Sequence, residues 1–340
     1  MSLKPFGASA FAACALLCLS LLMPGPARSE EKGIVMKFTF PTINDQVHQF
    51  AKNYAAAVEK DSGGRIKAEL YPASQLGSIP RQIEGVQFGA IQCAIIPPEF
   101  FVGIDERFQL LAAPGLITSF AHGQRVAGDA AVQKIMLSLG AKKGLHGAGL
   151  FYALPSSVIA KSAIRHLADF KGKKIRIFAS DFQKLTLERL GATPVAMSLS
   201  DVLPAIQQGA IDGAVSGLTV YTTMHYQDAA KYVTDTGQPA IFLIVELSAK
   251  WRASLPKDLQ QIVDRDAAKE AVAINPYDAQ FYKDQRKIWV ERGGEFISLP
   301  PDEQSAMMED MGNVGEVVTK HKPALRDAFM AIVAAAKRLR

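Results

Sequence analysis

From residue 35 onward, the apolar and polar positions follow two alternating patterns, one typical of strands and one typical of helices. Short apolar or strictly alternating runs predict strands, and apolar residues that recur every three or four positions predict helices. In the first third of the chain the predicted strands are residues 35–40, 65–70 and 91–96, and the predicted helices are residues 47–62 and 79–88. This order of elements predicts a mainly parallel sheet with helices on both faces.

A second set of the same kind follows residue 150. Its predicted strands are residues 158–161, 174–178, 193–197 and 212–216, with helices at 182–190 and 201–208 between them. Residues 240–245 form the most hydrophobic later run, whose length suits a buried strand. Gly147-Ala148-Gly149 lacks the third glycine of a dinucleotide-binding motif, so we interpret it as a bend between a strand and its crossover. Two α/β sets in 340 residues predict two domains.

The pattern changes after Lys257. A charged, alanine-rich helical pattern runs to about Glu291, which exceeds the length of an ordinary globular helix. Pro276 should kink or interrupt it, because proline lacks the N–H that a helix interior needs. Two interpretations are open: one long helix that spans two lobes, or two helices broken near Asn275. The remaining predicted elements are a strand at 295–297 and closing helices from residue 300, the last at 324–340.

The first residues have the composition of a secretory signal peptide. Lys4 precedes an apolar run at 8–23, and Ala27-Arg28-Ser29 places small residues at the −3 and −1 positions of a cleavage site. The apolar run is short for a membrane span, and an uncleaved anchor is the alternative. We therefore predict a signal peptide at residues 1–29, cleaved near Ser29, and a periplasmic mature protein.

Charge and cysteine content narrow the classes of partner. Cleavage would remove Lys4 and Arg28, so the net charge would fall from +5 to +3. The sequence has no stripe rich in lysine and arginine and interleaved with aromatic residues, so we predict no nucleic-acid partner. Cys93 is the only cysteine after residue 29, which leaves no internal disulfide.

Motifs for catalysis, metals and cofactors are missing from the sequence. Its six histidines are scattered, and no P-loop, zinc motif or G-x-S-x-G nucleophile elbow occurs. We therefore predict no cofactor, no metal site and no enzyme activity. An exported enzyme on the same fold is an alternative. Its acid or base would be sought at Asp45, Glu99 or Asp181, although we interpret each of these as a turn or cap residue.

Residues 169–176, with the sequence DFKGKKIR, contain the main candidate for ligand binding. Arg176 lies in the β-branched and aromatic run 174–178, near the C-terminal end of a strand that leads into a helix. Ligands bind at this edge of open α/β sheets. Composition alone leaves two interpretations of Arg176, a surface ion pair or a ligand-binding side chain.

Four segments resemble the solute-binding proteins of tripartite ATP-independent periplasmic (TRAP) transporters, the DctP-type family. In order along the chain they are GGRIKAELYPASQLG at 63–77, LADFKGKKIR at 167–176, LGATPVAMSLSDVLPAIQQGAIDG at 190–213 and WRASLPKDLQQIV at 251–263. The resemblance implies a two-lobed periplasmic binding-protein fold that closes on an organic acid. It also implies delivery of that acid to a pair of TRAP membrane permease subunits driven by an ion gradient.

The resemblance further implies lobe boundaries and a key residue. Lobe I would comprise residues 33–153 and 242–281, and lobe II residues 154–241 and 282–336, each a mainly parallel sheet flanked by helices. A long helix would span both lobes. Arg176 occupies the position of the family's carboxylate-binding arginine, whose planar guanidinium can form two parallel hydrogen bonds with a carboxylate.

The chain departs from the family pattern at several pocket positions. Ser156 stands where many members have a second arginine, and Ala179, Leu199, Val215 and Ser216 stand where members often have polar or aromatic side chains. We therefore expect a ligand with one essential carboxylate and an apolar or aromatic body.

The walls of this pocket would include Phe100, Leu199, Leu218 and Tyr221, each of which could instead belong to the core. A C4-dicarboxylate is the alternative ligand, if Ser156 or backbone amides hold the second carboxylate. A ligand sensor is an alternative function on the same fold. We predict a monomer, with pairing of two copies through the C-terminal helix as the alternative.

Overall fold

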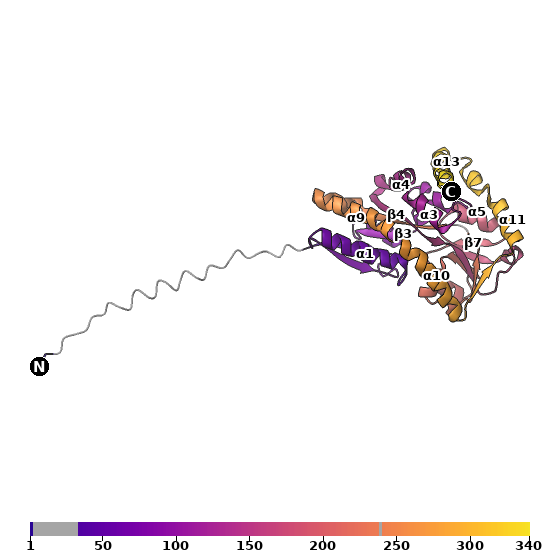
Figure 1. Cartoon of the computed structure of the whole chain (residues 1–340), viewed down its shortest axis with the longest axis horizontal. Helices are drawn as coiled ribbons and strands as arrows, with labels where there is room; N and C mark the ends of the chain where they lie inside the picture. Colours follow the sequence, from indigo (N-terminus) through magenta and orange to yellow (C-terminus); the bar gives the residue numbers. More distant parts are fainter. Residues whose placement is uncertain (3–32, 238–239) are drawn as a thin grey trace. The chain divides into compact units, whose positions relative to one another are not determined.

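The computed structural model describes residues 1–2, 33–237 and 240–340 (Figure 1). Apart from its first two residues, the predicted signal peptide, with Cys14 and Cys18, lies outside the described residues. The segment Ile34–Arg340 folds as one unit. Within the described ranges, no helix combines the length and the apolar content that a membrane span requires.

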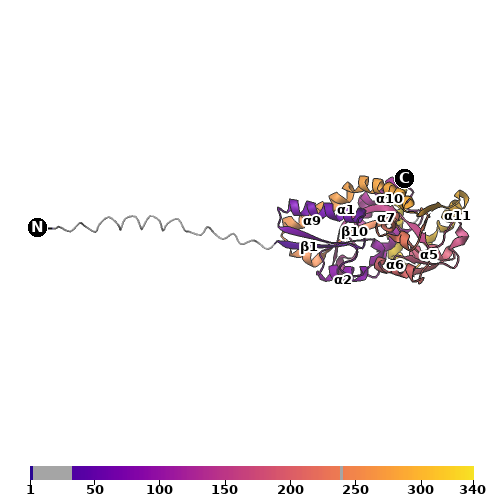
Figure 2. The same cartoon turned by 90° about the horizontal axis from the view of Figure 1, so that it is seen from below.

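The first sheet has five strands in the order β2-β1-β3-β10-β4. Their bounds are β1 Ile34–Thr39, β2 Ile66–Tyr71, β3 Cys93–Ile96, β4 Leu145–Pro155 and β10 Ala240–Ser248. Strand β1 pairs in parallel with β2 and β3, whereas β10 runs antiparallel to both of its neighbours. Helices α1 (Gln46–Asp61) and α9 (Lys257–Ala273) lie on one face of this sheet, and α2 (Ile79–Phe88) lies on the other (Figure 2).

The second sheet has six strands in the order β11-β9-β5-β8-β6-β7. Their bounds are β5 Ser157–Ala160, β6 Lys174–Ile177, β7 Thr193–Ala196, β8 Gly213–Ser216, β9 Tyr232–Asp235 and β11 Glu295–Ser298. Strand β6 is parallel to β7 and β8, and β9 is parallel to β11, whereas β5 is antiparallel to β8 and β9.

Both sheets are therefore mainly parallel, as predicted, and each contains one strand that runs against the others, β10 in the first sheet and β5 in the second. Strands β5 and β10 enter their sheets from the other sheet, through the connections β4–β5 and β9–β10. Each arrives from the side where the parallel strands end, so each runs against them. The same geometry turns the carboxyl ends of β1, β3, β6 and β8 toward the crossovers, which is the edge where α/β sheets bind ligands.

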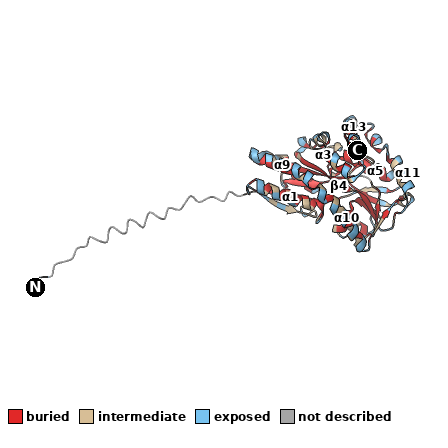
Figure 3. Ribbon diagram, viewed as in Figure 1, coloured by how far each residue is buried: buried red, intermediate tan, exposed pale blue. Residues whose placement is uncertain are grey.

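The remaining elements cover the two sheets. The helices are α3 Phe120–Gly128, α4 Ala130–Met136, α5 Asp181–Arg189, α6 Leu199–Gln207, α7 Leu218–Thr223, α8 Ala249–Ser254, α10 Asn275–Glu291, α11 Pro301–Met311, α12 Val314–Thr319 and α13 Pro323–Arg338. Short 3₁₀ turns include Pro98–Phe101 and Glu106–Ala112. Buried residues concentrate on the strands and on the inner faces of the helices (Figure 3).

The long helical pattern after Lys257 forms two helices, α9 and α10, which meet at Ile274. Ile274 keeps helical angles (φ −72°, ψ −22°), and its N–H donates to the Glu270 carbonyl at 3.0 Å. The interruption comes two residues before Pro276, which has no N–H to continue the ladder. Helix α9 packs on α1 and β4, and α10 packs on α7 and β11, so the pair runs from the first sheet to the second.

Strand β4 is the main element that the sequence pattern did not predict. The bend expected at Gly147-Ala148-Gly149 is wrong, because all three residues belong to β4. The register between β4 and β10 shifts between Val245 and Glu246, opposite these glycines, which is the mark of a β-bulge. Gly147 is also required by space, since a Cβ there would lie 2.6 Å from the Leu137 Cα.

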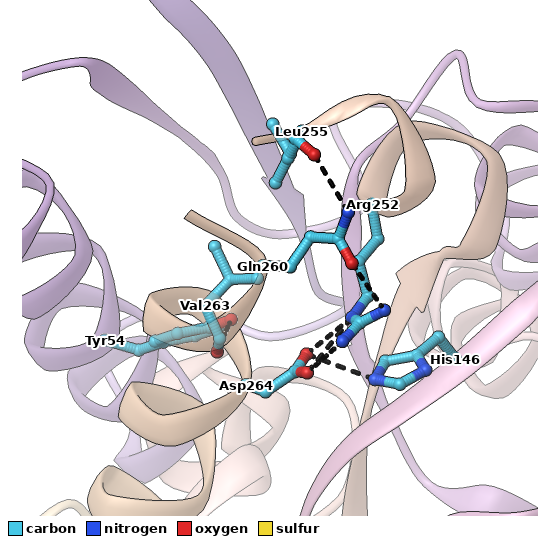
Figure 4. A network of polar contacts seen from close by, with 7 residues as sticks. All are labelled: Tyr54, His146, Arg252, Leu255, Gln260, Val263 and Asp264. Atoms are coloured by element: carbon cyan, nitrogen blue, oxygen red, sulfur yellow. Dashed lines mark hydrogen bonds and ion pairs between the residues drawn. The ribbon is translucent and has the colours of Figure 1, made fainter. Parts of the chain in front are cut away.

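Polar contacts fasten α8 and α9 to β4 (Figure 4). Arg252 donates to the Asp264 carboxylate, with Nε 2.8 Å from Oδ1, and His146 Nε2 lies 3.1 Å from the same oxygen. Gln260 Nε2 donates to the Leu255 carbonyl at 2.8 Å and closes the loop between the two helices. Burial of Asp264 opposes its ionisation, but the bonds from His146 and Arg252 outweigh it and lower the pKa of Asp264. This network supports the first sheet.

Replacing Gly147 with alanine should destabilise the protein by about 2 kcal/mol, because the new methyl would overlap the Leu137 backbone. Gly128→Ala is the matched control, since a Cβ there meets nothing within 4 Å and the residue ends a helix. Urea denaturation of both variants measures the difference. Equal stability of the two variants would contradict the close approach of β4 to Leu137.

Candidate functional site

Arg176 lies near the end of β6 and is 1% exposed. Its Nε donates to the Met197 carbonyl at 3.0 Å, and one terminal nitrogen donates to the Val215 carbonyl at 2.9 Å. These carbonyls follow β7 and belong to β8, the two neighbours of β6. The sheet therefore fixes the direction of the guanidinium. An arginine has more N–H donors than these two bonds use.

Two neighbouring phenylalanine rings lie beside the guanidinium. The Arg176 Cζ lies 4.7 Å from the ring centre of Phe178 and 5.6 Å from that of Phe100. The rings are 5.2 Å apart. Aromatic faces stabilise a cation without using its N–H groups, so the donor edge of the guanidinium stays available.

The guanidinium has no anionic partner in the described part of the chain, where no carboxylate forms an ion pair with Arg176. Burial lowers its pKa to about 10, so the side chain remains a cation at neutral pH. A buried cation that lacks a counter-ion is costly unless an anion reaches it. The position therefore favours binding of an external carboxylate or another anion.

A small cavity of about 40 Å³ lies beside Arg176, between elements of the two sheets. Its second-sheet lining is Arg176, Phe178, Leu199, Ser216 and Val220. Its first-sheet lining is Pro41, Thr42, Asp45, Gln46, Val47, Ile79, Pro97, Phe100, Leu154, Ile241 and Leu243. Most of these side chains are apolar, and the polar ones gather at Arg176 and on the connection between β1 and α1.

The structure brings four of the six candidate residues to this cavity, namely Arg176, Phe100, Leu199 and Ser216. The other two, Tyr221 and Ser156, are absent from its lining. The Tyr221 hydroxyl lies 2.9 Å from the Ser157 carbonyl and 2.8 Å from the Ala214 carbonyl, so it belongs to the core of the second sheet. Ser156 is buried at the β4–β5 crossover. Leu218 is fully buried and also lies outside the lining.

A model of one protein family matches residues 39–320, and its description is "bacterial extracellular solute-binding protein, family 7". The chain belongs to this family. Family 7 comprises transport proteins and not enzymes, which confirms the prediction that this chain is not an enzyme.

Two relatives align with most of the chain. The C4-dicarboxylate-binding periplasmic protein DctP of Rhodobacter capsulatus is 25% identical over 296 residues, which cover 86% of this chain and 87% of that protein. The uncharacterized protein YiiZ of Salmonella typhimurium is 26% identical over 266 residues, which cover 73% of this chain and 80% of that protein.

Solved structures confirm the predicted two-lobed α/β fold. A TRAP periplasmic solute-binding protein from Desulfovibrio salexigens with bound orotic acid has a TM-score of 0.84 and 20% identity, over 90% of this chain and 99% of that one. The sugar acid binding protein DctPAm of Advenella mimigardefordensis, in complex with galactonate, has a TM-score of 0.85 and 18% identity, over 91% of this chain and 99% of that one.

The cavity beside Arg176 also contains polar groups that the sequence pattern did not assign to the site. Thr42, Asp45 and Gln46 line it and are each at least nine-tenths buried. Asp45 also caps α1, since its Oδ1 accepts the His48 N–H at 3.0 Å. The sequence does place these residues after the carboxyl end of β1, where ligand-binding residues are expected. Asp45 was not included in the predicted site because we interpreted it as a turn or cap residue.

Three buried carboxyl groups surround this region. Burial raises the pKa of Asp45 to about 6 and that of Glu99 to about 8, and attraction by Arg176 only partly offsets the shift at Glu99. Burial, followed by the charge of Asp45, raises the pKa of Asp278 on α10 to about 9. Asp181 is different, because it is half exposed and lies 3.3 Å from Lys322 Nζ.

Arg286 lines a second cavity of about 580 Å³, beside α3 and α10. Its Cζ lies 4.2 Å from the ring centre of Phe296, on the surface of α10. The smaller cavity is the better candidate site because its arginine is fully buried and held by two carbonyls.

Asp278→Asn should change how stability depends on pH. The folded protein holds a proton on Asp278 up to about pH 9, whereas the unfolded chain releases it near pH 4. The wild type therefore loses stability as the pH rises between these values, by at most about 1.4 kcal/mol per pH unit. The variant should be more stable than the wild type at pH 8 and gain little at pH 5, measured by thermal unfolding.

Asp284→Asn is the control for this comparison, because Asp284 is exposed on the same helix. It should leave the pH dependence unchanged. A gain from Asp278→Asn that is the same at pH 5 and pH 8 would contradict a protonated Asp278.

Proposed function

We propose that the chain is the periplasmic solute-binding subunit of a TRAP-type transporter and that it binds an organic acid through Arg176. The observation that carries the proposal is a fully buried guanidinium at a cavity between two sheets, without a carboxylate partner in the described residues. A ligand carboxylate would supply the missing counter-charge through paired hydrogen bonds.

The family 7 neighbours support the chemical class of the ligand. The Rhodobacter relative is named for C4-dicarboxylates, and the neighbouring structures hold orotic acid and galactonate. Further neighbours hold succinate and glucuronate. All of these ligands carry a carboxylate. Phe100 and Leu199 give the cavity of this chain apolar walls, which favours a ligand with an apolar or aromatic part, and a C4-dicarboxylate is the alternative.

Closure and delivery complete the proposed function. The lobes would comprise residues 33–153 with 242–281 and residues 154–241 with 282–336, and they would open to release the acid. The partners would be the TRAP membrane permease subunits, and the binding protein would act as a monomer. The α9–α10 junction and the two strand crossovers are the connections that would flex.

Arg176→Ala should abolish binding of organic acids. Loss of a charge-assisted hydrogen-bond pair costs on the order of 1.5–3 kcal/mol, a factor of about ten to over one hundred in affinity. Thermal-shift screening of the mature protein with succinate, orotate, galactonate, glucuronate and benzoate would find a binder, and calorimetry would measure it in the variant.

Two further variants sharpen this test. Arg176→Lys keeps the charge but not the paired geometry, so it should bind more weakly than the wild type. Arg286→Ala should leave affinity unchanged, because Arg286 lines the second cavity. Full affinity in Arg176→Ala, or its loss in Arg286→Ala, would move the binding site away from Arg176.

Export should leave a mature chain that begins near Glu30, since the predicted cleavage site follows Ser29. Mass spectrometry of the protein recovered from the periplasm of a bacterial host measures this terminus. Recovery of the intact chain in the membrane fraction would instead indicate an uncleaved anchor.

A further inference from the structure

The first-sheet wall of the cavity is rich in buried oxygen atoms. Thr42 and Asp45 lie in the connection between β1 and α1, and Gln46 is the first residue of α1. All three line this wall. Their exposed fractions are 4%, 1% and 1%. Asp45 Oδ2, Thr42 Oγ1 and Gln46 Oε1 are buried atoms that form no hydrogen bond of good geometry among the described residues, although, against the burial that raises the pKa of Asp45, the neighbouring Thr42 hydroxyl helps to lower it.

Asp45 is the informative member of this group. Its Oδ1 is already used by the cap bond from the His48 N–H, so Oδ2 is the oxygen that remains. No lysine or arginine of the described chain forms an ion pair with it, and the nearby ionisable group on α10 is another carboxyl, Asp278. An ionised carboxylate only accepts hydrogen bonds. This wall can therefore accept a hydrogen bond from a ligand donor, and an ionised Asp45 would repel a second carboxylate.

We propose that the solute carries a hydrogen-bond donor, a hydroxyl or an ammonium group, at the end remote from the carboxylate that pairs with Arg176, and that Asp45 accepts it. The inference rests on the proposed function, because it assumes that Arg176 holds the carboxylate. It narrows the ligand class to acids that are cationic or hydroxylated at the far end. A purely apolar far end would leave Asp45 Oδ2 buried with at most the Thr42 hydroxyl as its partner, which is costly for an ionised carboxylate.

Two matched series of acids test this inference by calorimetry. The first is pentanoate, 4-hydroxybutyrate, 4-aminobutyrate and succinate, and the second is 4-methylbenzoate, 4-hydroxybenzoate, 4-(aminomethyl)benzoate and terephthalate. Within each series only the far group changes. In the series that fits the cavity, the hydroxyl or the ammonium member should bind the wild type at least about tenfold more tightly than the methyl and the dicarboxylate members.

Asp45→Asn is the decisive variant, since asparagine also caps helices and so keeps α1 intact. It removes the charge and adds a donor. The ammonium acid should lose about tenfold in affinity and the dicarboxylate should gain about as much. Damage to the fold would instead weaken all acids alike. Asp129→Asn is the matched control, because Asp129 caps α4 and does not line the cavity.

The outcomes separate the two proposals. Binding of no acid from either series, or from the thermal-shift screen, to the wild type would overturn the carboxylate site at Arg176 and this inference with it. Binding that Arg176→Ala abolishes but that Asp45→Asn leaves in the same order of affinities would overturn only the role of Asp45. Tightest binding of a dicarboxylate, weakened by Asp45→Asn, would also overturn it, because Asp45 would then share a proton with the second carboxylate.

Discussion

A buried guanidinium without a carboxylate partner is the constraint on which the binding site depends. The carbonyls of Met197 and Val215 accept two of the Arg176 hydrogen bonds, and two neighbouring aromatic rings lie beside its guanidinium. Those carbonyls come from the strands on either side of β6, so the parallel arrangement β8-β6-β7 sets the orientation of the cation. Arg176 lines the cavity, and its two hydrogen bonds leave other N–H donors of the guanidinium unused. The sheet thus positions a buried charge beside the cavity.

The topology of the two sheets brings the first-sheet lining of the cavity close to Arg176. Parallel strands of both sheets end on the side of the crossovers, so the segment after β1 and the strand β6 contribute to one cavity although their sheets differ. The first sheet supplies oxygen acceptors and the second supplies N–H donors. A small molecule with complementary ends would be oriented by this polarity, and its apolar middle would contact Phe100 and Leu199.

The sequence predicted the parts of the site that depend on local pattern. Arg176 was found because a basic residue in a β-branched run, followed by cap residues, has few alternative interpretations once the family resemblance is added. The burial of Asp45 was not predictable in the same way, because it depends on α10, whose Asp278 lies 233 positions later. The position of Tyr221 outside the cavity lining was not predictable for a similar reason, because its hydroxyl contacts carbonyl oxygens of β8 and of the start of β5, which are distant in the sequence. Strand β4 was missed because its bulge glycines resemble a turn.

The position of β10 also affects how the chain is assembled during synthesis. Strand β4 has one neighbour in the first sheet, β10, and these two strands are separated by about 85 residues that form most of the second sheet. Because synthesis starts at the N-terminus, β4 is made well before β10, its neighbour in the first sheet. The first sheet therefore cannot close until the strands of the second have been made, and neither half can finish folding as an early, independent unit. Such a chain stays incompletely folded late in its synthesis, which is the state in which an unfolded polypeptide can be threaded through a narrow channel.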